Sequence, residues 1–254
     1  GGTDIIATME NVIGSAFGDS ITGDSSDNLI NGGAGADTIL GGDGDDTIIG
    51  GDDADSIDGG DGADVITGDG GANNIDGGAG NDSIVGGADA ETILGGAGDD
   101  QIVGGGGNDT LNGGDDNDVV SAGGADAVTI IGGAGNDTLT GSSSGDVITG
   151  DAGNDVINGG DGPDTIDGGA DDDDINGGAG ADSILGGDGN DTLTGGAGVD
   201  TLEGETGTAD VVDYSGAAAG VTVDLTADAA TDDGDGASDV LTDGTEVVSG
   251  SGLH

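Results

Sequence analysis

Aspartates recur at a spacing of nine residues through most of this chain. In the units GGAGADTIL (32–40) and GGDGDDTII (41–49), the sixth residue is Asp37 or Asp46. Carboxylates without any Cys or Lys nearby can do two kinds of chemistry, acid–base catalysis or the binding of hard cations. Oxygen-only ligands select hard metal ions, and calcium fits best because it accepts six to eight oxygens in flexible geometry. The repeated aspartate therefore predicts repeated calcium sites.

The composition requires a positively charged partner of this kind. The chain has 254 residues with 65 glycines, 54 acidic residues and neither lysine nor arginine, so its formal net charge is −54. A chain with few bulky apolar residues and a high net charge cannot offset its ordering entropy by burial alone. Nucleic acid is excluded as a partner because no basic side chain neutralises phosphate, and an anionic membrane surface is disfavoured for the same reason.

Other sources of stability and of localisation are missing from the sequence. There is no cysteine, so disulfides cannot hold the fold. No segment approaches the roughly 20 apolar residues of a membrane span, so membrane insertion is not expected. The N-terminal stretch GGTDIIATMENV has no basic region and no apolar core of the length that a secretory signal needs. Metal ions remain as the stabilising partner.

The nine-residue unit also defines the elements that would position the aspartates. Twelve units run from Gly14 to Ser121 and nine more from Gly123 to Glu203; position six is aspartate in 17 of these 21 units, and position eight is Ile, Leu or Val in all of them. The glycine-rich first six residues predict a turn, and the last three predict a short strand with its centre pointing inward. Turn plus strand, repeated, predicts a solenoid. Its core column would include Ile39, Ile48, Ile57, Ile66, Ile84 and Leu139.

These units resemble the RTX family of hemolysin-type calcium-binding repeats, whose pattern is GGxGxDxUx with U a large aliphatic residue. The resemblance covers residues 14–203. It implies an all-β fold, a parallel β-roll with two units per turn, and calcium ions held between successive loops on each edge by aspartates and loop carbonyls. It also implies an extracellular protein that is exported by type I machinery and folded outside by calcium.

If each unit makes half a turn, alternate units stack on the same edge, and the candidate ligands form two columns. The first edge would carry Asn28 and then Asp46, Asp64, Asp82, Asp100, Asp118, Asp137, Asp155, Asp173 and Asp191. The second edge would carry Asp19, Asp37, Asp55, Asn73, Glu91, Asp109, Val128, Asp146, Asp164, Asp182 and Asp200.

The two columns differ in quality, because the second departs from aspartate at Asn73, Glu91 and Val128. Asparagine can coordinate through its amide oxygen but brings no charge, and glutamate is longer and can misplace its oxygens. We hypothesise that the first edge binds a continuous ladder of calcium while the second has weak or missing sites near residues 73–128. The alternative is neutral drift in a redundant array whose loops are mostly filled.

The join between the two runs, at residues 121–131, admits two registers. Starting a unit at Gly123 keeps Ile130 in the core column but leaves Val128 in the ligand position. Starting it at Ser121 makes Asp126 a ligand and Val128 a core residue. The second register is preferred because it places an aspartate at the ligand position and an aliphatic residue at the core position. Both registers predict a local irregularity.

The two ends of the chain depart from the repeat. Residues 1–13 are expected to form an N-terminal junction, 14–203 the roll, and 204–254 a β cap or junction leading toward a further repeat block. The segment MENVIGSAFG (9–18) aligns without gaps on TEVVSGSGLH (245–254). This self-similarity predicts one period of a longer array with further copies or blocks end to end, and chance similarity is the alternative.

Catalysis is not expected. The single histidine is His254, and there is no Cys or Lys nucleophile. The prediction is a calcium-binding structural module of a large secreted or cell-surface protein, of the adhesin, surface-layer or extracellular filament type. The alternative is the C-terminal export and folding domain of a secreted hydrolase or toxin whose catalytic part lies outside this chain.

Overall fold

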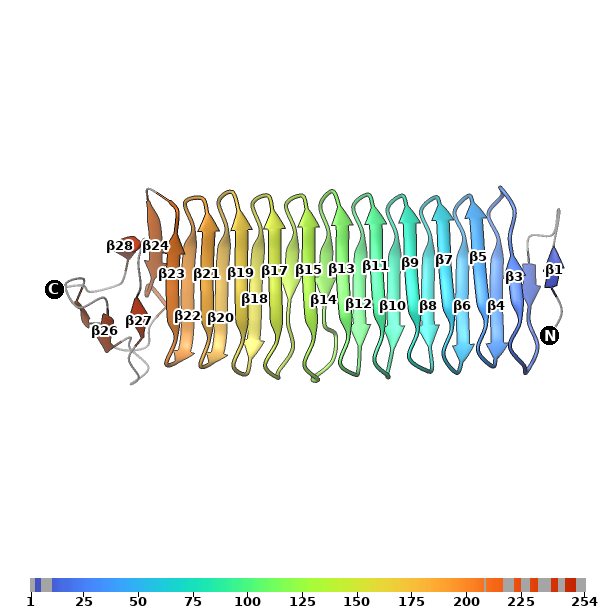
Figure 1. Cartoon of the computed structure of the whole chain (residues 1–254), viewed down its shortest axis with the longest axis horizontal. Helices are drawn as coiled ribbons and strands as arrows, with labels where there is room; N and C mark the ends of the chain where they lie inside the picture. Colours follow the sequence, from blue (N-terminus) through green and yellow to red (C-terminus); the bar gives the residue numbers. More distant parts are fainter. Residues whose placement is uncertain are drawn as a thin grey trace. The chain divides into compact units, whose positions relative to one another are not determined.

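The computed structural model describes residues 3–5, 11–207, 209–216, 222–224, 229–232, 239–241 and 245–249. All regular elements in these residues are β strands (Figure 1). Nowhere in the described ranges is there a helix of the length and apolarity needed to cross a membrane. The chain divides into two compact units, Gly1–Thr129 and Ile130–His254.

The first unit consists of two parallel sheets formed by alternate strands. In Figure 1 its odd-numbered strands all point one way and its even-numbered strands the other way. One sheet has the order β1 (Thr3–Ile5), β3 (Ser20–Thr22), β5 (Thr38–Asp43), β7 (Ser56–Asp61), β9 (Asn74–Ala79), β11 (Thr92–Ala97) and β13 (Thr110–Asp115). The other has the order β2 (Asn11–Ile13), β4 (Leu29–Ala34), β6 (Thr47–Asp52), β8 (Val65–Asp69), β10 (Ser83–Gly87), β12 (Gln101–Gly105) and β14 (Val119–Ser121).

The second unit repeats this arrangement and adds a short antiparallel section. One sheet runs β15 (Thr129–Ala134), β17 (Val147–Ala152), β19 (Thr165–Ala170), β21 (Ser183–Asp188), β23 (Thr201–Glu205) and β27 (Val240–Leu241), followed by the antiparallel β26 (Ala229–Asp232) and β25 (Thr222–Asp224). The other runs β16 (Thr138–Thr140), β18 (Val156–Asp161), β20 (Asp174–Gly180), β22 (Thr192–Gly198), β24 (Asp210–Asp213) and β28 (Thr245–Ser249).

The strand register confirms the predicted β-roll. Ile30 pairs with Ile48 and Ile48 with Ile66, so neighbouring strands of one sheet carry equivalent residues 18 positions apart. One turn of the solenoid therefore contains two nonapeptides. Each turn contributes one strand to each sheet, as an amphipathic turn-and-strand repeat requires.

The core is the predicted column of position-eight side chains. Ile39, Ile48 and Ile84 have 0% exposure, and their neighbours at positions seven and nine face outward. This alternation is the two-residue period of a strand, so only one aliphatic side chain of each short strand enters the interior. The core is thin, and each side chain packs mainly on its equivalents one turn away.

The strands are longer than the three residues predicted. Most continue through the two glycines that open the next unit, so that Gly33 pairs with Gly51 in the ladder between β4 and β6. Gly51 has a φ of 118°, a conformation that L-residues rarely adopt. The paired glycines thus extend the sheet to the point where the chain turns.

The irregular join at residues 121–131 follows the register that starts at Gly123, so the preferred alternative was wrong. The Thr129 N–H donates to the Asp109 carbonyl at 2.9 Å, the same bond that Thr110 makes with Glu91 one turn earlier. Thr129 therefore stands at position seven and Val128 at position six, with 5% exposure. The extra residue is Gly123, because Gly124 meets the Gly105 carbonyl as the second glycine of a unit does, and the Ala122 carbonyl lies beside Gly104 as that of Gly113 lies beside Gly95. Ala122 is fully buried. Burial of these apolar side chains decides the register in place of the aspartate pattern.

The roll continues beyond Glu203, where the nonapeptide pattern was predicted to end. Thr192 pairs with Val211 and Leu193 with Val212, so β24 adds a further strand in register. Leu202 likewise pairs with Leu241 of β27 in the other sheet. The self-similar segments 9–18 and 245–254 lie partly outside the described residues, so their side-chain equivalence stays a prediction.

The thin core predicts a large cost for deleting a single inward side chain. Ile84→Ala is expected to lower the free energy of unfolding in calcium-containing buffer by about 2 to 5 kcal/mol, because the cavity lies between packed turns. Chemical denaturation followed by far-UV circular dichroism measures this loss. The matched control is Val85→Ala, the next residue, whose side chain is 42% exposed and whose truncation should cost less than about 0.5 kcal/mol. Equal losses in the two variants would contradict the core assignment.

Candidate metal centre

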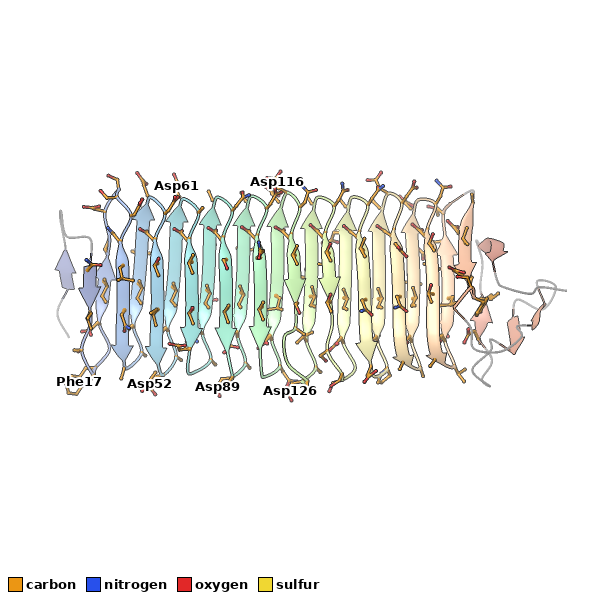
Figure 2. All side chains as sticks on the ribbon, turned by 180° about the vertical axis from the view of Figure 1, so that it is seen from behind. Phe17, Asp52, Asp61, Asp89, Asp116 and Asp126 are labelled. Atoms are coloured by element: carbon orange, nitrogen blue, oxygen red, sulfur yellow. The ribbon has the colours of Figure 1, made fainter. Side chains whose placement is uncertain are left out.

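The loops of the roll lie on two opposite edges. Loops that lead from odd to even strands form the first edge, and loops that lead from even to odd strands form the second. Figure 2 shows Asp61 and Asp116 on one edge, and Asp52, Asp89 and Asp126 on the opposite edge. Each nonapeptide therefore presents its turn residues to one edge, as the alternation of units predicts.

Nearly all predicted column aspartates are buried, with exposures of 3% or less. In the first unit these are Asp46, Asp64, Asp82, Asp100 and Asp118 on the first edge, and Asp37, Asp55 and Asp109 on the second. In the second unit they are Asp137, Asp155, Asp173 and Asp191 on the first edge, and Asp146, Asp164, Asp182 and Asp200 on the second. Asp19, at the beginning of the second edge, is half-buried.

One oxygen of each column aspartate ties two turns together. The Asp46 N–H donates to Asp64 Oδ1 at 2.7 Å, and the Asp64 N–H donates to Asp82 Oδ1 at 2.8 Å. The same bond spans 18 residues along both edges, for example from the Asp164 N–H to Asp182 Oδ1 at 2.9 Å. Hydrogen bonds that end on a carboxylate are stronger than neutral ones. Each column is thus a ladder of backbone N–H groups and carboxylates.

The other oxygen of most column aspartates is buried and accepts no hydrogen bond. This holds for the Oδ2 atoms of Asp37, Asp46, Asp55, Asp64, Asp82, Asp100, Asp109, Asp155, Asp164, Asp173, Asp182 and Asp191. Buried polar atoms in folded proteins nearly always have a partner, and a buried charge without one is costly. The chain contains no Lys or Arg to supply a positive charge. These atoms therefore call for a cation or a proton.

The surroundings of Oδ2 contain backbone oxygen as well. A methyl group at Gly59, the first residue of its unit, would overlap both Asp64 Oδ2 and the Gly77 carbonyl oxygen. The first glycine is therefore needed to leave room for these oxygens. In the described residues no three His, Cys, Asp or Glu side chains come together as a metal cluster. A metal ion would have to take few carboxylates and several loop carbonyls, an oxygen-only set that fits calcium.

Asn73 turns its amide nitrogen to the place where the aspartates have Oδ2, whereas Asn28 keeps an oxygen there, since a methyl group at Gly23 would overlap Asn28 Oδ1. The Asp55 N–H donates to Asn73 Oδ1 at 2.9 Å, which leaves Asn73 Nδ2 buried without a hydrogen bond. Asn28 uses its Oδ1 to accept the Asp24 N–H at 2.9 Å. An NH₂ group cannot coordinate a cation. Asn73 therefore removes a ligand oxygen from the column as well as a negative charge.

The other departures affect the second edge in different ways. Both carboxylate oxygens of Glu91 are buried without hydrogen bonds, so this side chain stays in the column. Val128 places an apolar side chain there. Asp126, the alternative ligand, is exposed at position four and accepts the Gly107 N–H at 3.1 Å, so the structure does not bring it into the column.

Comparison with known proteins agrees with this geometry. The family model of the RTX calcium-binding nonapeptide repeat matches residues 13–48, 49–84, 85–120, 120–148, 149–184 and 176–208. The chain belongs to this RTX family. No curated protein matches it. Among solved structures, the X-ray crystal structure of a hyperactive, Ca²⁺-dependent, β-helical antifreeze protein from an Antarctic bacterium is 20% identical with a TM-score of 0.37, over 80% of this chain and 87% of that one.

The RTX columns include two buried aspartates that the nonapeptide pattern missed. Asp210 has 0% exposure, its Oδ1 accepts the Asp191 N–H at 3.1 Å, and its Oδ2 has no hydrogen bond. Asp239 has 1% exposure, and its Oδ1 accepts the Asp200 N–H at 3.0 Å. The signal was present as ADVV (209–212) and SDVL (238–241), in which an aspartate precedes a core residue by two positions.

A second, outer ladder on the first edge was also missed. Its members are exposed Asp and Asn residues at position five: Asp27, Asp45, Asn81, Asp99 and Asn117 in the first unit, and Asn136, Asn154, Asp172 and Asn190 in the second. The Asn117 N–H and side-chain amide both donate to Asp99 Oδ1 at 3.0 Å. The second edge carries mostly Ala or Gly at this position, so the DD or ND pair in alternate units was the available signal.

Burial raises the pKa of many column carboxyls, among them Asp46, Asp82, Asp155 and Asp173. Desolvation is the main cause in each case, opposed by the hydrogen bond from the preceding turn and reinforced by neighbouring carboxylates. The pKa rises to about 7 for Asp82 and Asp173 and to about 6 for Asp46 and Asp155. The pKa of Glu91 rises to about 8 through burial and then through the charge of Asp109.

These raised pKa values predict how the metal-free protein responds to pH. The pKa of these carboxyls in the folded protein lies above the ordinary value of 3.8. Each protonated carboxyl therefore stabilises the fold fully at a pH below 3.8, and this stabilisation is lost as the pH rises through about 6 to 7. In excess chelator, the β signal in far-UV circular dichroism should therefore be larger at pH 4 than at pH 8. With saturating calcium the trend should reverse, because protons compete with the metal. A metal-free signal that grows between pH 4 and pH 8 would contradict the assignment.

Proposed function

We propose that this RTX chain is a calcium-binding structural module of a large secreted or cell-surface protein, which folds and stiffens when calcium binds. The observation that carries the proposal is the row of buried Oδ2 atoms without hydrogen bonds. A divalent ion would supply the positive charge that the chain lacks and would turn repulsion between stacked carboxylates into attraction.

The calcium ions would lie between successive loops of each edge. On the first edge of the first unit, Asp46, Asp64, Asp82, Asp100 and Asp118 would supply the carboxylates. Backbone carbonyls of the loops and of the strand ends, such as that of Gly77, would complete the coordination. Without metal, a thin core of one aliphatic side chain per strand has to hold a chain of net charge −54. Binding and folding should therefore be coupled.

The second edge of the first unit would bind calcium less completely. Asn73 presents Nδ2 instead of an oxygen, and Val128 presents no polar atom. Glu91 keeps two buried oxygens, but its pKa near 8 means that a proton competes with a metal ion at neutral pH. These three positions support the hypothesis that the first edge holds the continuous ladder and the second a broken one.

A passive, extracellular role is favoured over catalysis. The described residues contain no histidine or cysteine, and their buried carboxylates are used as rungs between turns. Calcium-dependent folding suits an extracellular location, where calcium is abundant. The alternative is an export and folding domain attached to a hydrolase or toxin.

The similarity between segments 9–18 and 245–254 favours the structural module, with further blocks continuing end to end. Val12 pairs with the core residue Ile30, and Val248 pairs with the core residue Val212. Both valines therefore take position eight of a unit. Sequencing of the full reading frame distinguishes tandem blocks from a fused enzyme.

The proposal predicts that column residues and exposed aspartates respond differently to substitution. Asp82→Ala should reduce the number of bound calcium ions in equilibrium dialysis, because it removes a buried oxygen from the first edge. It should also raise the calcium concentration needed for the circular dichroism signal of the roll. Asp61→Ala is the control, since Asp61 is exposed on the same edge (Figure 2). A wild-type protein that stays β-rich in excess chelator at pH 8, or two variants that bind alike, would refute the proposal.

The broken second edge predicts a gain of binding. Asn73→Asp should increase the number of bound calcium ions, because it replaces a buried NH₂ group by the oxygen that other turns present. Asn73→Ala should leave that number near the wild-type value, whereas Asp137→Ala should lower it. The control for added charge is Asn81→Asp, an exposed position on the first edge. Equal losses for Asn73→Ala and Asp137→Ala would support uniform filling of both edges instead.

A further inference from the structure

Asp239 differs from Asp164 and Asp182, two buried aspartates of the same edge, because its second oxygen has a side-chain partner. Its Oδ1 accepts the Asp200 N–H at 3.0 Å, the same bond that joins the earlier turns. Its Oδ2 accepts the O–H of Tyr214, also at 3.0 Å. In Asp164 and Asp182 the equivalent Oδ2 atom is buried without any hydrogen bond. A phenol hydroxyl thus binds the oxygen that Asp164 and Asp182 leave without a hydrogen bond.

The chain brings these two residues together across a long insertion. Tyr214 directly follows β24, and Asp239 directly precedes β27. Asp239 lies 39 residues after Asp200, whereas most column neighbours are 18 apart. The strands β25 and β26 belong to the intervening stretch, and β26 pairs antiparallel with β27. The Tyr214–Asp239 bond therefore joins the two ends of the insertion at the edge of the roll.

The environment of the bond makes it a strong constraint. Tyr214 is 6% exposed and Asp239 is 1% exposed, so the hydroxyl and the carboxylate are both shielded from water. A buried carboxylate oxygen needs a donor, and a hydrogen bond to a charged group is stronger than one between neutral groups. A hydroxyl that donates to Oδ2 also directs its proton at the oxygen that a calcium ion would otherwise coordinate. The phenol therefore weakens this atom as a calcium ligand, because it uses one of its lone pairs and withdraws part of its negative charge.

We propose that Tyr214 ends the calcium column of the second edge, so that Asp239 is held by a hydrogen bond in place of a metal ion. This inference rests on the proposed function of the columns. Tyr214 acts as a positioning residue: it fixes Asp239 for the N–H of Asp200 and closes the last turn of this edge without calcium. The number of ions bound along the edge is then limited by the tyrosine and not by the supply of buried aspartates.

Calcium counting tests this limit. Asp239→Asn keeps the Oδ1 acceptor for Asp200 and should leave the number of bound calcium ions at the wild-type value. Asp182→Asn is the matched control inside the same column, and it should lower that number. A loss of calcium in Asp239→Asn comparable to that in Asp182→Asn would overturn the inference. If neither substitution lowers the number of bound calcium ions, the proposed calcium-binding function of the column is wrong. The Tyr214–Asp239 bond is then tested separately by fluorescence.

That signal is the fluorescence of Tyr214, which is the single tyrosine in a chain without tryptophan. A phenol that donates to a carboxylate passes its proton on in the excited state, which quenches its emission. Asp239→Asn should therefore raise the emission of the calcium-loaded protein, Asp182→Asn should not, and Tyr214→Phe serves as the blank. Unchanged emission in Asp239→Asn would overturn the inference. If Asp239→Asn fails to fold, the wild-type protein provides the test. Its tyrosine emission should rise when it is denatured at constant pH, because denaturation breaks the bond to Asp239. Equal emission from the folded and the denatured protein would contradict the bond.

Discussion

The fold depends on a carboxylate that serves two purposes at once in every turn. One oxygen of such a column aspartate accepts an N–H from the preceding turn, and in most of these aspartates the other oxygen is buried without a hydrogen-bond donor. The first interaction sets the 18-residue register, because it pairs each aspartate with its equivalent one turn away. The second leaves an electrostatic cost that grows with every turn added. A stack of such turns is therefore stable only to the extent that something positive enters it, which makes stability and ion binding inseparable.

The rest of the architecture follows from packing around that carboxylate. The first glycine of a unit must lack a side chain because Oδ2 and a carbonyl oxygen occupy the space. The second glycine must take a positive φ to carry the strand into the turn. Only position eight is left for the interior, so each strand contributes one aliphatic side chain. The core of an RTX roll is thin because the sequence assigns most of its positions to the turn.

Much of this could be predicted from the sequence because the repeat is short and uses different positions for different roles. One position of each unit carries the packing residue, and another carries the polar residue. Position eight predicts the core, which the structure confirms. Position six predicts the calcium ligands, and the structure buries most of those carboxylates in two columns. The register at residues 121–131 was predicted wrongly because a match of residue types favoured Asp126. In the structure, burial of Val128 and Ala122 outweighs that match. Asp239 could not be found by counting nines, since a long insertion separates it from Asp200. The contact with Tyr214 is a tertiary feature that no local pattern encodes.

The two edges of the first unit differ in how far they rely on ions. The first edge has two ladders whose hydrogen bonds run in opposite directions: Asp46 donates to Asp64 in the next turn, whereas Asp45 donates back to Asp27 in the previous one. Most consecutive loops are thus tied twice by the chain itself, and the outer ladder is interrupted at Ala63. The second edge has mostly alanine or glycine at the outer position and also carries Asn73, Glu91 and Val128. Its loops are also joined outside the column by the bonds from the Gly71 N–H to Asp89 and from the Gly107 N–H to Asp126. Its column is nevertheless interrupted, so loss of calcium should open this edge first. The regular edge would then hold the turns in register while the other one exchanges its ions.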